Sequence, residues 1–422
     1  MNRRQFLGTL AAACLVARSR ADEAPDAKLI LSAPLTHSDW MLKPNIEPAE
    51  AGVRHMLDAC KAAGWSRVMW RVCDAGQATY RSKLMRPGLH HEPNTIFSPQ
   101  TDEDGASVKR LLPNLTVEQG KGYLEKMARI DYAAFDSLAA ATAYGREIGL
   151  KIWAWVTINE DDHGWGWPSE FTKAHPQFRW VRRDGRPYHS QLSFAFEEVR
   201  KYKLGLLEEL LAYPIDGVFL DWIRTGDIRD NPQNTPEGIA DYGYEAPNVE
   251  AFKKEYGLNP HAVAIDDERW ARVRAEPQTH FMRAARALLK ARRPDLPLAV
   301  MVGHPWHYRG AIDRIAGNLR GLLLDLGTWA AEGLIDAAVA AGYYRDGGNA
   351  GLAYDALRKE TAGKCEVWYY AWVPQNVGEF ERDFDLAHSV GAKQILFWEA
   401  DYIDDRRSPG ELKRAMAARA KW

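Results

Sequence analysis

Acidic, aromatic and basic residues follow short apolar runs at several points along this chain. If such runs are strands of a parallel barrel, the residues at their carboxyl ends point into one mouth, where catalytic groups are sought first. The candidates are Arg71, Asp74, Asn159, Glu160, Asp221, Trp222, His304, Trp306, His307, Tyr343, Trp372, Trp398, Glu399 and Asp401. Carboxylates beside aromatic rings suit hydrolysis of glycosidic bonds, in which two carboxyl groups divide the acid and the nucleophile or base roles.

Asp221 is the strongest single candidate. It follows the apolar run 218–220, so a strand there would bury its carboxylate. An unpaired buried carboxylate costs several kcal/mol, which requires either a cavity or a partner. A structural salt bridge to Arg71 or Arg224 is the alternative to a catalytic role.

Two further acids complete the predicted catalytic set. Glu399 follows the apolar run 395–398 and is the expected general acid/base, with a purely ligand-positioning role as the alternative. Glu160 and Asp401 are the candidates for the acid/base role if Glu399 does not fill it. Glu160 begins a run of three acids, a pattern that is also typical of a solvated loop. The residues expected to bind substrate are Arg71, Asp74, Trp222, His304, Trp306, Tyr343, Trp372, Trp398 and Asp401.

The alternation of short apolar runs with longer amphipathic stretches repeats about eight times. The expected strands are Leu29–Ala33, Arg67–Cys73, Leu150–Ile158, Gly217–Ile223, Leu298–Gly303, Ala337–Ala341, Glu366–Val373 and Gln394–Glu399. The expected helices are Ala49–Ala63, Tyr132–Ile148, Glu197–Leu211, His280–Arg293, Leu352–Thr361 and Glu379–Val390. Near-continuous apolar strands separated by helices indicate a parallel sheet covered on both faces. Eight such units predict an α/β fold of the (β/α)8 TIM barrel type.

The connections indicate which end of the barrel carries the site. The loops that leave strands are long, at 74–129, 159–196, 224–247 and 304–319, whereas the returns to the next strand are short. Long loops at the C-terminal face are typical of a barrel whose site lies there. We therefore expect one domain over residues 22–422, with an elaborated loop at 75–130 that could form a small subdomain.

Composition narrows the function class. With 55 basic and 57 acidic residues there is no general basic surface, so duplex nucleic acid is not an expected partner. No glycine-rich phosphate loop follows the first strand, and no Walker lysine loop occurs, so no nucleotide cofactor is expected. The 16 tryptophans exceed the 13 phenylalanines. They suggest either a large core with polar-tipped rings or an aromatic-lined cleft.

The N-terminal 21 residues have the features of a removable export signal. Arg3 and Arg4 precede a Phe-Leu step and a short apolar run, as in twin-arginine signals. That run is too short to span a bilayer, so no integral membrane span is expected in the mature chain. Cleavage after Ala21 predicts a periplasmic or secreted protein, and lipid attachment at Cys14 is the weaker alternative.

One segment carries a family resemblance. Residues 175–180 read His-Pro-Gln-Phe-Arg-Trp and an Asp-Gly follows; a predicted helix opens with Glu-Val-Arg at 198–200, and Asp-Gly-Val-Phe-Leu-Asp occupies 216–221. With the strand at 149–156, this segment resembles the glycosyl-hydrolase-like, family-10-like (β/α)8 barrel proteins. The resemblance implies a carbohydrate substrate and the role of nucleophile for Asp221. No matched motif identifies the acid/base, so Glu399 is inferred from its position alone.

The chain also departs from that family pattern. Trp222 stands where the family commonly has a second acid, and Ser193-Phe194 replaces an Asn-Pro. The missing acid favours the alternative of a non-catalytic glycan-binding barrel. A metal-dependent hydrolase that uses His304 and His307 is the second alternative, although no metal ligand motif is present and no metal or other cofactor is expected. The sequence does not indicate an oligomeric state.

Overall fold

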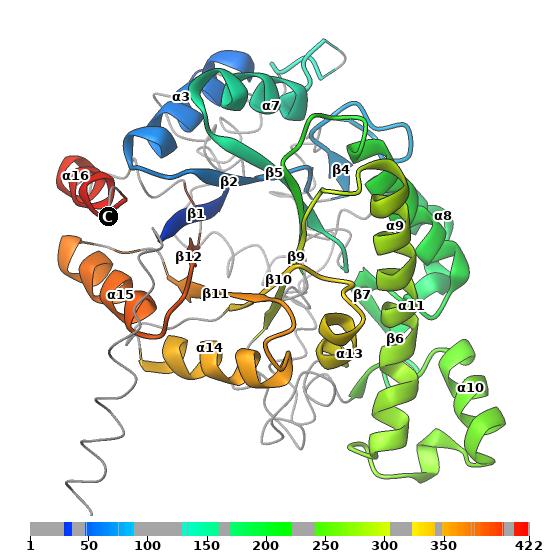
Figure 1. Cartoon of the computed structure of the whole chain (residues 1–422). Coiled ribbons are helices and arrows are strands. Elements are labelled where there is room, and N and C mark those ends of the chain that lie inside the picture. Colours follow the sequence, from blue (N-terminus) through cyan, green and yellow to red (C-terminus); the bar gives the residue numbers. More distant parts are fainter. Residues whose placement is uncertain are drawn as a thin grey trace, which may run out of the picture.

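The computed structural model describes residues 29–35, 47, 49–74, 76–87, 129–132, 134–159, 169–221, 241–303, 323–341, 348–372, 374, 376–398, 400 and 409–420. Eight parallel strands close into a barrel in the order β1-β2-β5-β8-β9-β10-β11-β12, which confirms the predicted TIM barrel (Figure 1). They are β1 (Ile30–Leu35), β2 (Arg67–Arg71), β5 (Lys151–Thr157), β8 (Gly217–Asp221), β9 (Leu298–Gly303), β10 (Ala337–Ala341), β11 (Glu366–Ala371) and β12 (Gln394–Phe397).

Helices surround this barrel and cover the outer face of its strands (Figure 1). They are α3 (Ala49–Ala62), α7 (Ser137–Ile148), α9 (Glu197–Leu210), α11 (Glu268–Arg292), α13 (Leu326–Ala331), α14 (Gly348–Glu360), α15 (Val377–Ser389) and α16 (Pro409–Arg419). All six predicted helices are present. Four of them begin elsewhere than predicted: α7, α11, α14 and α15. In α7, the Asp136 side chain caps the helix by accepting from the Ala139 amide. The Asp267 side chain caps α11, which begins before Pro277, whereas the predicted helix began beyond it.

The lower part of the barrel interior is packed with aromatic rings. The rings of Trp153 and Trp368 meet edge to face at 5.6 Å, and the Arg67 guanidinium carbon lies 4.5 Å from the Trp153 ring centroid. Gly217 faces the same ring at a distance that leaves no room for a Cβ. Part of the tryptophan excess is therefore core packing, as the first of the two interpretations predicted.

The long loops carry small elements that the sequence analysis did not predict. Between β5 and α9 lie α8 (Glu170–Ala174), the 3₁₀ helix η1 (Pro176–Phe178) and the antiparallel strands β6 (Arg179–Val181) and β7 (Pro187–Leu192). The predicted loop 75–130 begins with the short pair β3 (Cys73–Asp74) and β4 (Gln77–Ala78), and its residues 88–128 lie outside the described part. The division into a signal and a single domain therefore stays a prediction.

A second, smaller core lies outside the ring of helices. Helix α10 (Ala246–Tyr256) projects from the barrel beside the start of α11, with the 3₁₀ helix η4 (Pro260–Ala262) between them (Figure 1). Its core consists of Tyr244, Phe252, Trp270 and Val273. Across the described residues, no helix has the length and apolar character needed to cross a membrane. The predicted signal, 1–21, lies outside them.

Glu245 joins the β6–β7 hairpin to α10. Only 2% of this residue is exposed. Its carboxylate accepts hydrogen bonds from the Val181 amide at 3.0 Å and from Asn248 Nδ2 at 3.1 Å. Burial nevertheless raises the pKa of Glu245 to about 7, because the loss of hydration outweighs these donors.

Glu245→Gln is expected to reduce the pH dependence of stability. Between pH 4.5 and about 7 the folded chain retains the Glu245 proton and the unfolded chain has released it, so stability falls as pH rises through this window. The full loss is about 3 kcal/mol. Urea unfolding at pH 5 and pH 8 measures it, and Glu250→Gln on the exposed face of α10 is the control. An unchanged difference between the two pH values in Glu245→Gln would contradict the assignment.

Candidate active site at the barrel mouth

Asp221 is the last residue of β8 and lies at the carboxyl end of the barrel. It is 1% exposed, and its Oδ2 accepts a hydrogen bond from the indole Nε1 of Trp155 at 3.2 Å. The register explains this contact: Asp221 pairs with Thr157 of β5, and Trp155 precedes Thr157 by two residues on the same inward face. The buried carboxylate that the sequence pointed to therefore has a neutral donor from the adjacent strand.

Arg71 ends β2 on the other side of Trp155. Its side chain is buried, its Nε donates to the Cys73 carbonyl oxygen at 3.0 Å, and its guanidinium carbon lies 5.0 Å from the Trp155 ring centroid. The Cys73 Sγ is 3.6 Å from Thr157 Oγ1. Burial raises the pKa of the Cys73 thiol, which favours its neutral form and disfavours a nucleophilic role.

Trp398 directly follows β12, the strand that pairs with β1 to close the barrel. Its ring meets that of Trp155 edge to face at 5.7 Å and lies 6.3 Å from the Tyr370 ring. The Trp398 amide donates to the Ala371 carbonyl oxygen at 2.9 Å, which fixes its position beside β11. Trp372, just beyond β11, is half-buried. Trp155 thus contacts both the Asp221 carboxylate and the Trp398 ring.

Asn159 is a further candidate site residue, which the predicted catalytic and binding set omitted. It lies two residues beyond Thr157, the last residue of β5, and the spacing of two from Trp155 and Thr157 was the signal for it. It is 3% exposed, and no donor in the described part of the chain reaches its Oδ1. A buried acceptor left without a donor costs about 1–3 kcal/mol, so this oxygen is suited to accept a hydroxyl of a bound molecule.

Asn159→Ala is expected to leave the melting temperature unchanged or slightly higher while raising KM, because it removes an acceptor that has no donor among the described residues. Asn248→Ala is the matched control. The Asn248 amide donates to the Gly243 carbonyl oxygen and to Glu245, so its loss should destabilise the fold by about 1–3 kcal/mol without changing KM. Thermal unfolding and steady-state kinetics measure both. A similar destabilisation in the two variants would show that Asn159 is structural.

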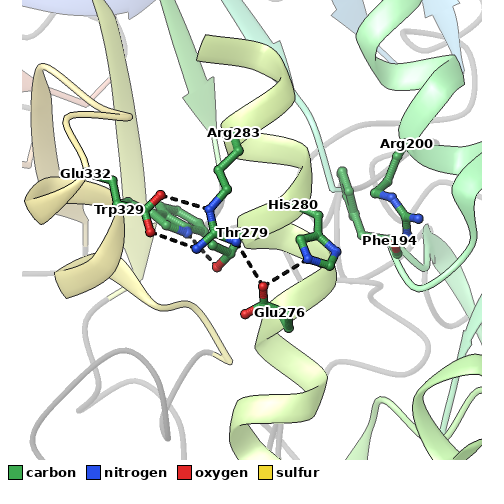
Figure 2. Close-up of polar contacts among 8 residues, drawn as sticks. All are labelled: Phe194, Arg200, Glu276, Thr279, His280, Arg283, Trp329 and Glu332. Atoms are coloured by element: carbon green, nitrogen blue, oxygen red, sulfur yellow. Dashed lines mark hydrogen bonds and ion pairs between the residues drawn. The ribbon is translucent and has the colours of Figure 1, made fainter. Parts of the chain in front are cut away.

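Charged residues also gather on α11, away from the mouth. Arg283 binds both carboxylate oxygens of Glu332, Glu276 bridges it to His280, and Trp329 donates to Thr279 Oγ1 at 2.9 Å (Figure 2). About half of the His280 and Glu276 side chains is exposed. Exposed ion pairs of this kind contribute little to stability individually. The cluster therefore connects α11 to α13 without a sign of a catalytic role.

Within the described ranges, no group of three or more histidine, cysteine or acidic side chains could hold a metal ion. Among the described residues, Cys60, Cys73 and Cys365 are not in disulfide bonds. The two histidines of the metal-dependent alternative, His304 and His307, lie outside the described residues.

The family of this chain follows from a match to a family model. The model of the family described as glycosyl hydrolase-like 10 matches residues 94–367. This chain belongs to the glycosyl hydrolase-like 10 family. The predicted resemblance is confirmed over a longer segment than the motifs covered. In this family member, the matched segment holds Asp221, Trp155 and Asn159, whereas Arg71 and Trp398 flank it and reach the mouth through closure of the barrel.

Similarity to solved structures supports the barrel fold and nothing more specific, because the sequence identities are low. The catalytic domain of a β-amylase from Paenibacillus polymyxa has a TM-score of 0.54 at 10% identity, and the match covers 94% of this chain and 99% of that one. A β-galactosidase from the psychrophilic Marinomonas ef1 has a TM-score of 0.53 at 12% identity, with 93% of this chain covered. This chain spans 59% of the length of that β-galactosidase. Among curated proteins, none matches.

The structure brings together part of the predicted site of this glycosyl hydrolase-like 10 protein. Arg71, Asp221 and Trp398 meet around Trp155, and Trp372 lies at the end of the neighbouring strand β11. Asp74 pairs through its backbone with Gln77, and its side chain is not among those described. The remaining predicted residues lie outside the described part: Glu160, Trp222, His304, Trp306, Tyr343, Glu399 and Asp401.

Proposed function

We propose that this protein hydrolyses O-glycosidic bonds in an exported polysaccharide or glycan. The observation that supports this most is the buried Asp221 carboxylate at the barrel mouth, which accepts a hydrogen bond from the Trp155 indole, itself packed on the Trp398 ring. Membership of the glycosyl hydrolase-like 10 family agrees with this chemistry. The twin-arginine pattern at the N-terminus supports a periplasmic or secreted location.

In the proposed mechanism, Asp221 brings negative charge to the anomeric carbon. It acts either as the nucleophile or as the charge that stabilises an oxocarbenium-like transition state. Glu399 is the proposed general acid/base, with Glu160 and Asp401 as substitutes. Three strands separate β8 from β12 around the barrel. If Asp221, at the end of β8, and Glu399, beyond β12 in the sequence, both act, this separation favours a wide distance between their carboxyl groups. A gap of about 5 Å gives retention of configuration, whereas roughly 6.5–9.5 Å gives inversion.

The other proposed residues bind sugar. Arg71, Asp74, His304, Tyr343 and Asp401 would hydrogen-bond hydroxyl groups, and tryptophan rings would stack against the C–H faces of the sugar. The rings are those of Trp222, Trp306, Trp372 and Trp398. Of these, Trp398 lies closest in sequence to the proposed acid/base and packs on Trp155.

A screen of the mature protein against a panel of polysaccharides and oligosaccharides tests the proposal. Release of reducing ends and binding are measured in parallel on each glycan, and β-galactosides are included because β-galactosidases share the fold. The proposal predicts turnover of at least one glycan, and Trp398→Ala should weaken its binding. Binding without release, lost in Trp398→Ala, would instead favour a glycan-binding barrel.

A further inference from the structure

The Trp155 indole contacts three groups of the mouth at once. Its Nε1 donates to Asp221 Oδ2 at 3.2 Å. The Arg71 guanidinium carbon lies 5.0 Å from its ring centroid, and the Trp398 ring meets it edge to face at 5.7 Å with an interplanar angle of 73°. All four side chains are buried. Trp155 therefore contacts all three of these groups.

These contacts favour an ionised and oriented Asp221. A hydrogen bond donated to a carboxylate stabilises its charged form more than its neutral form. The nearby Arg71 cation attracts the π electrons of the indole, which leaves the N–H edge more positive and a better donor. Because the indole is rigid and packed on Trp398, the direction of its N–H is fixed before any ligand arrives.

Trp153 shows that this barrel does not require a partner for every indole. It lies two residues earlier on the same strand and the same face, and it is also buried. Its Nε1 has no acceptor among the described residues, and its ring contacts Arg67 and Trp368 in the lower part of the barrel. The hydrogen bond of Trp155 to Asp221 is therefore a specific feature of the mouth.

We propose that Trp155 is a positioning residue for Asp221: its indole N–H holds the carboxylate and links it to the packing of Trp398, the ring on which sugar is expected to stack. This inference rests on the proposed function. The two tests below distinguish failure of the positioning role of Trp155 from failure of the proposed hydrolysis.

The first test needs no substrate. In a protein labelled with ¹⁵N at its tryptophan indoles, the signal that disappears in Trp155→Phe belongs to Trp155, and Trp153→Phe identifies the control. In Asp221→Asn the Trp155 proton signal should move upfield, because a neutral amide accepts more weakly than a carboxylate, while the Trp153 signal stays in place. A Trp155 signal that Asp221→Asn leaves unchanged overturns the inference, whatever the catalytic activity.

The second test compares turnover in Trp155→Phe and Trp153→Phe, which remove the same N–H from neighbouring positions. Trp155→Phe should lower kcat about ten- to a hundredfold, the loss expected for one hydrogen bond to a charged group, and change KM little. The acidic limb of its kcat/KM profile should move to higher pH, because Asp221 loses a donor that favours ionisation. Trp153→Phe should change neither. Matching rates and pH profiles in the two variants would show that Trp155 only fills space, whereas full activity in Asp221→Asn would instead refute the proposed function.

Discussion

Asp221→Asn is expected to lower kcat by at least about a thousandfold while the barrel stays folded. Asparagine has the same shape and keeps an oxygen that can accept from the Trp155 indole, so the packing at the end of β8 is preserved. It lacks the negative charge that glycosidic bond cleavage requires at the anomeric carbon. Initial rates on a cleaved glycan measure the loss, and circular dichroism with thermal unfolding verifies the fold.

Asp216→Asn is the matched control for this prediction. Asp216 precedes the other end of β8, where its Oδ2 accepts from the Ile152 amide at 2.9 Å, far from the mouth. The same substitution there should cost some stability and leave kcat within a few-fold of wild type. If Asp221→Asn retained near-normal turnover, Asp221 would have no catalytic role.

Gly217→Ala is expected to lower the free energy of unfolding by about 3 kcal/mol, the upper part of the usual range for overpacking a core. A Cβ on Gly217 would lie 2.3 Å from Cδ2 of Trp153. The Trp153 ring has little freedom to move away, because Trp368 and Arg67 pack against it. Urea unfolding at 25 °C measures the change.

Gly205→Ala provides the contrast. Gly205 lies inside α9, and its Cβ would lie 2.6 Å from Cδ1 of Leu84, the end of a side chain that is 46% exposed and free to turn aside. Alanine is also the better helix former by about 1 kcal/mol. Gly205→Ala should therefore be neutral or stabilising. Equal destabilisation by the two substitutions would mean that the Trp153 ring does not restrict Gly217.

The barrel could be predicted from sequence because its signal is local. Each buried parallel strand is a short apolar run, and Leu298–Gly303 and Ala337–Ala341 were predicted with the observed bounds. The β6–β7 hairpin was missed because residues 179–192 are rich in charged and polar residues and show no clear period. Helix α10 was missed as well, since it packs on a small separate core.

The site was predictable in a different way. Asp221, Arg71 and Trp398 could be named because each stands at or just beyond the carboxyl end of a strand. Trp155 could not, because it lies inside β5 and reads as core. Its contact with Asp221 depends on the β5–β8 register. That register pairs Thr157 with Asp221, which makes Trp155 a diagonal neighbour of Asp221.

Some of the tryptophans pack the core and others lie at the barrel mouth, so both interpretations of the tryptophan excess apply. Trp153 and Trp368 fill the lower barrel, and Trp65 and Trp270 are buried elsewhere. Trp155 and Trp398 border the Asp221 carboxylate at the upper end of the same barrel. A tryptophan of the core, Trp153, and a tryptophan of the proposed site, Trp155, therefore lie on the same strand, β5, two residues apart.

Chemical rescue of Asp221→Gly tests most directly whether the Asp221 carboxylate acts on the anomeric carbon. Removing the side chain leaves space for azide, an anion that can attack where the carboxylate would act. On a glycan that the wild type cleaves, the variant should be inactive alone and regain turnover with azide, releasing the sugar as its glycosyl azide. Cleavage at the wild-type rate without azide, and without an azide product, would contradict the account.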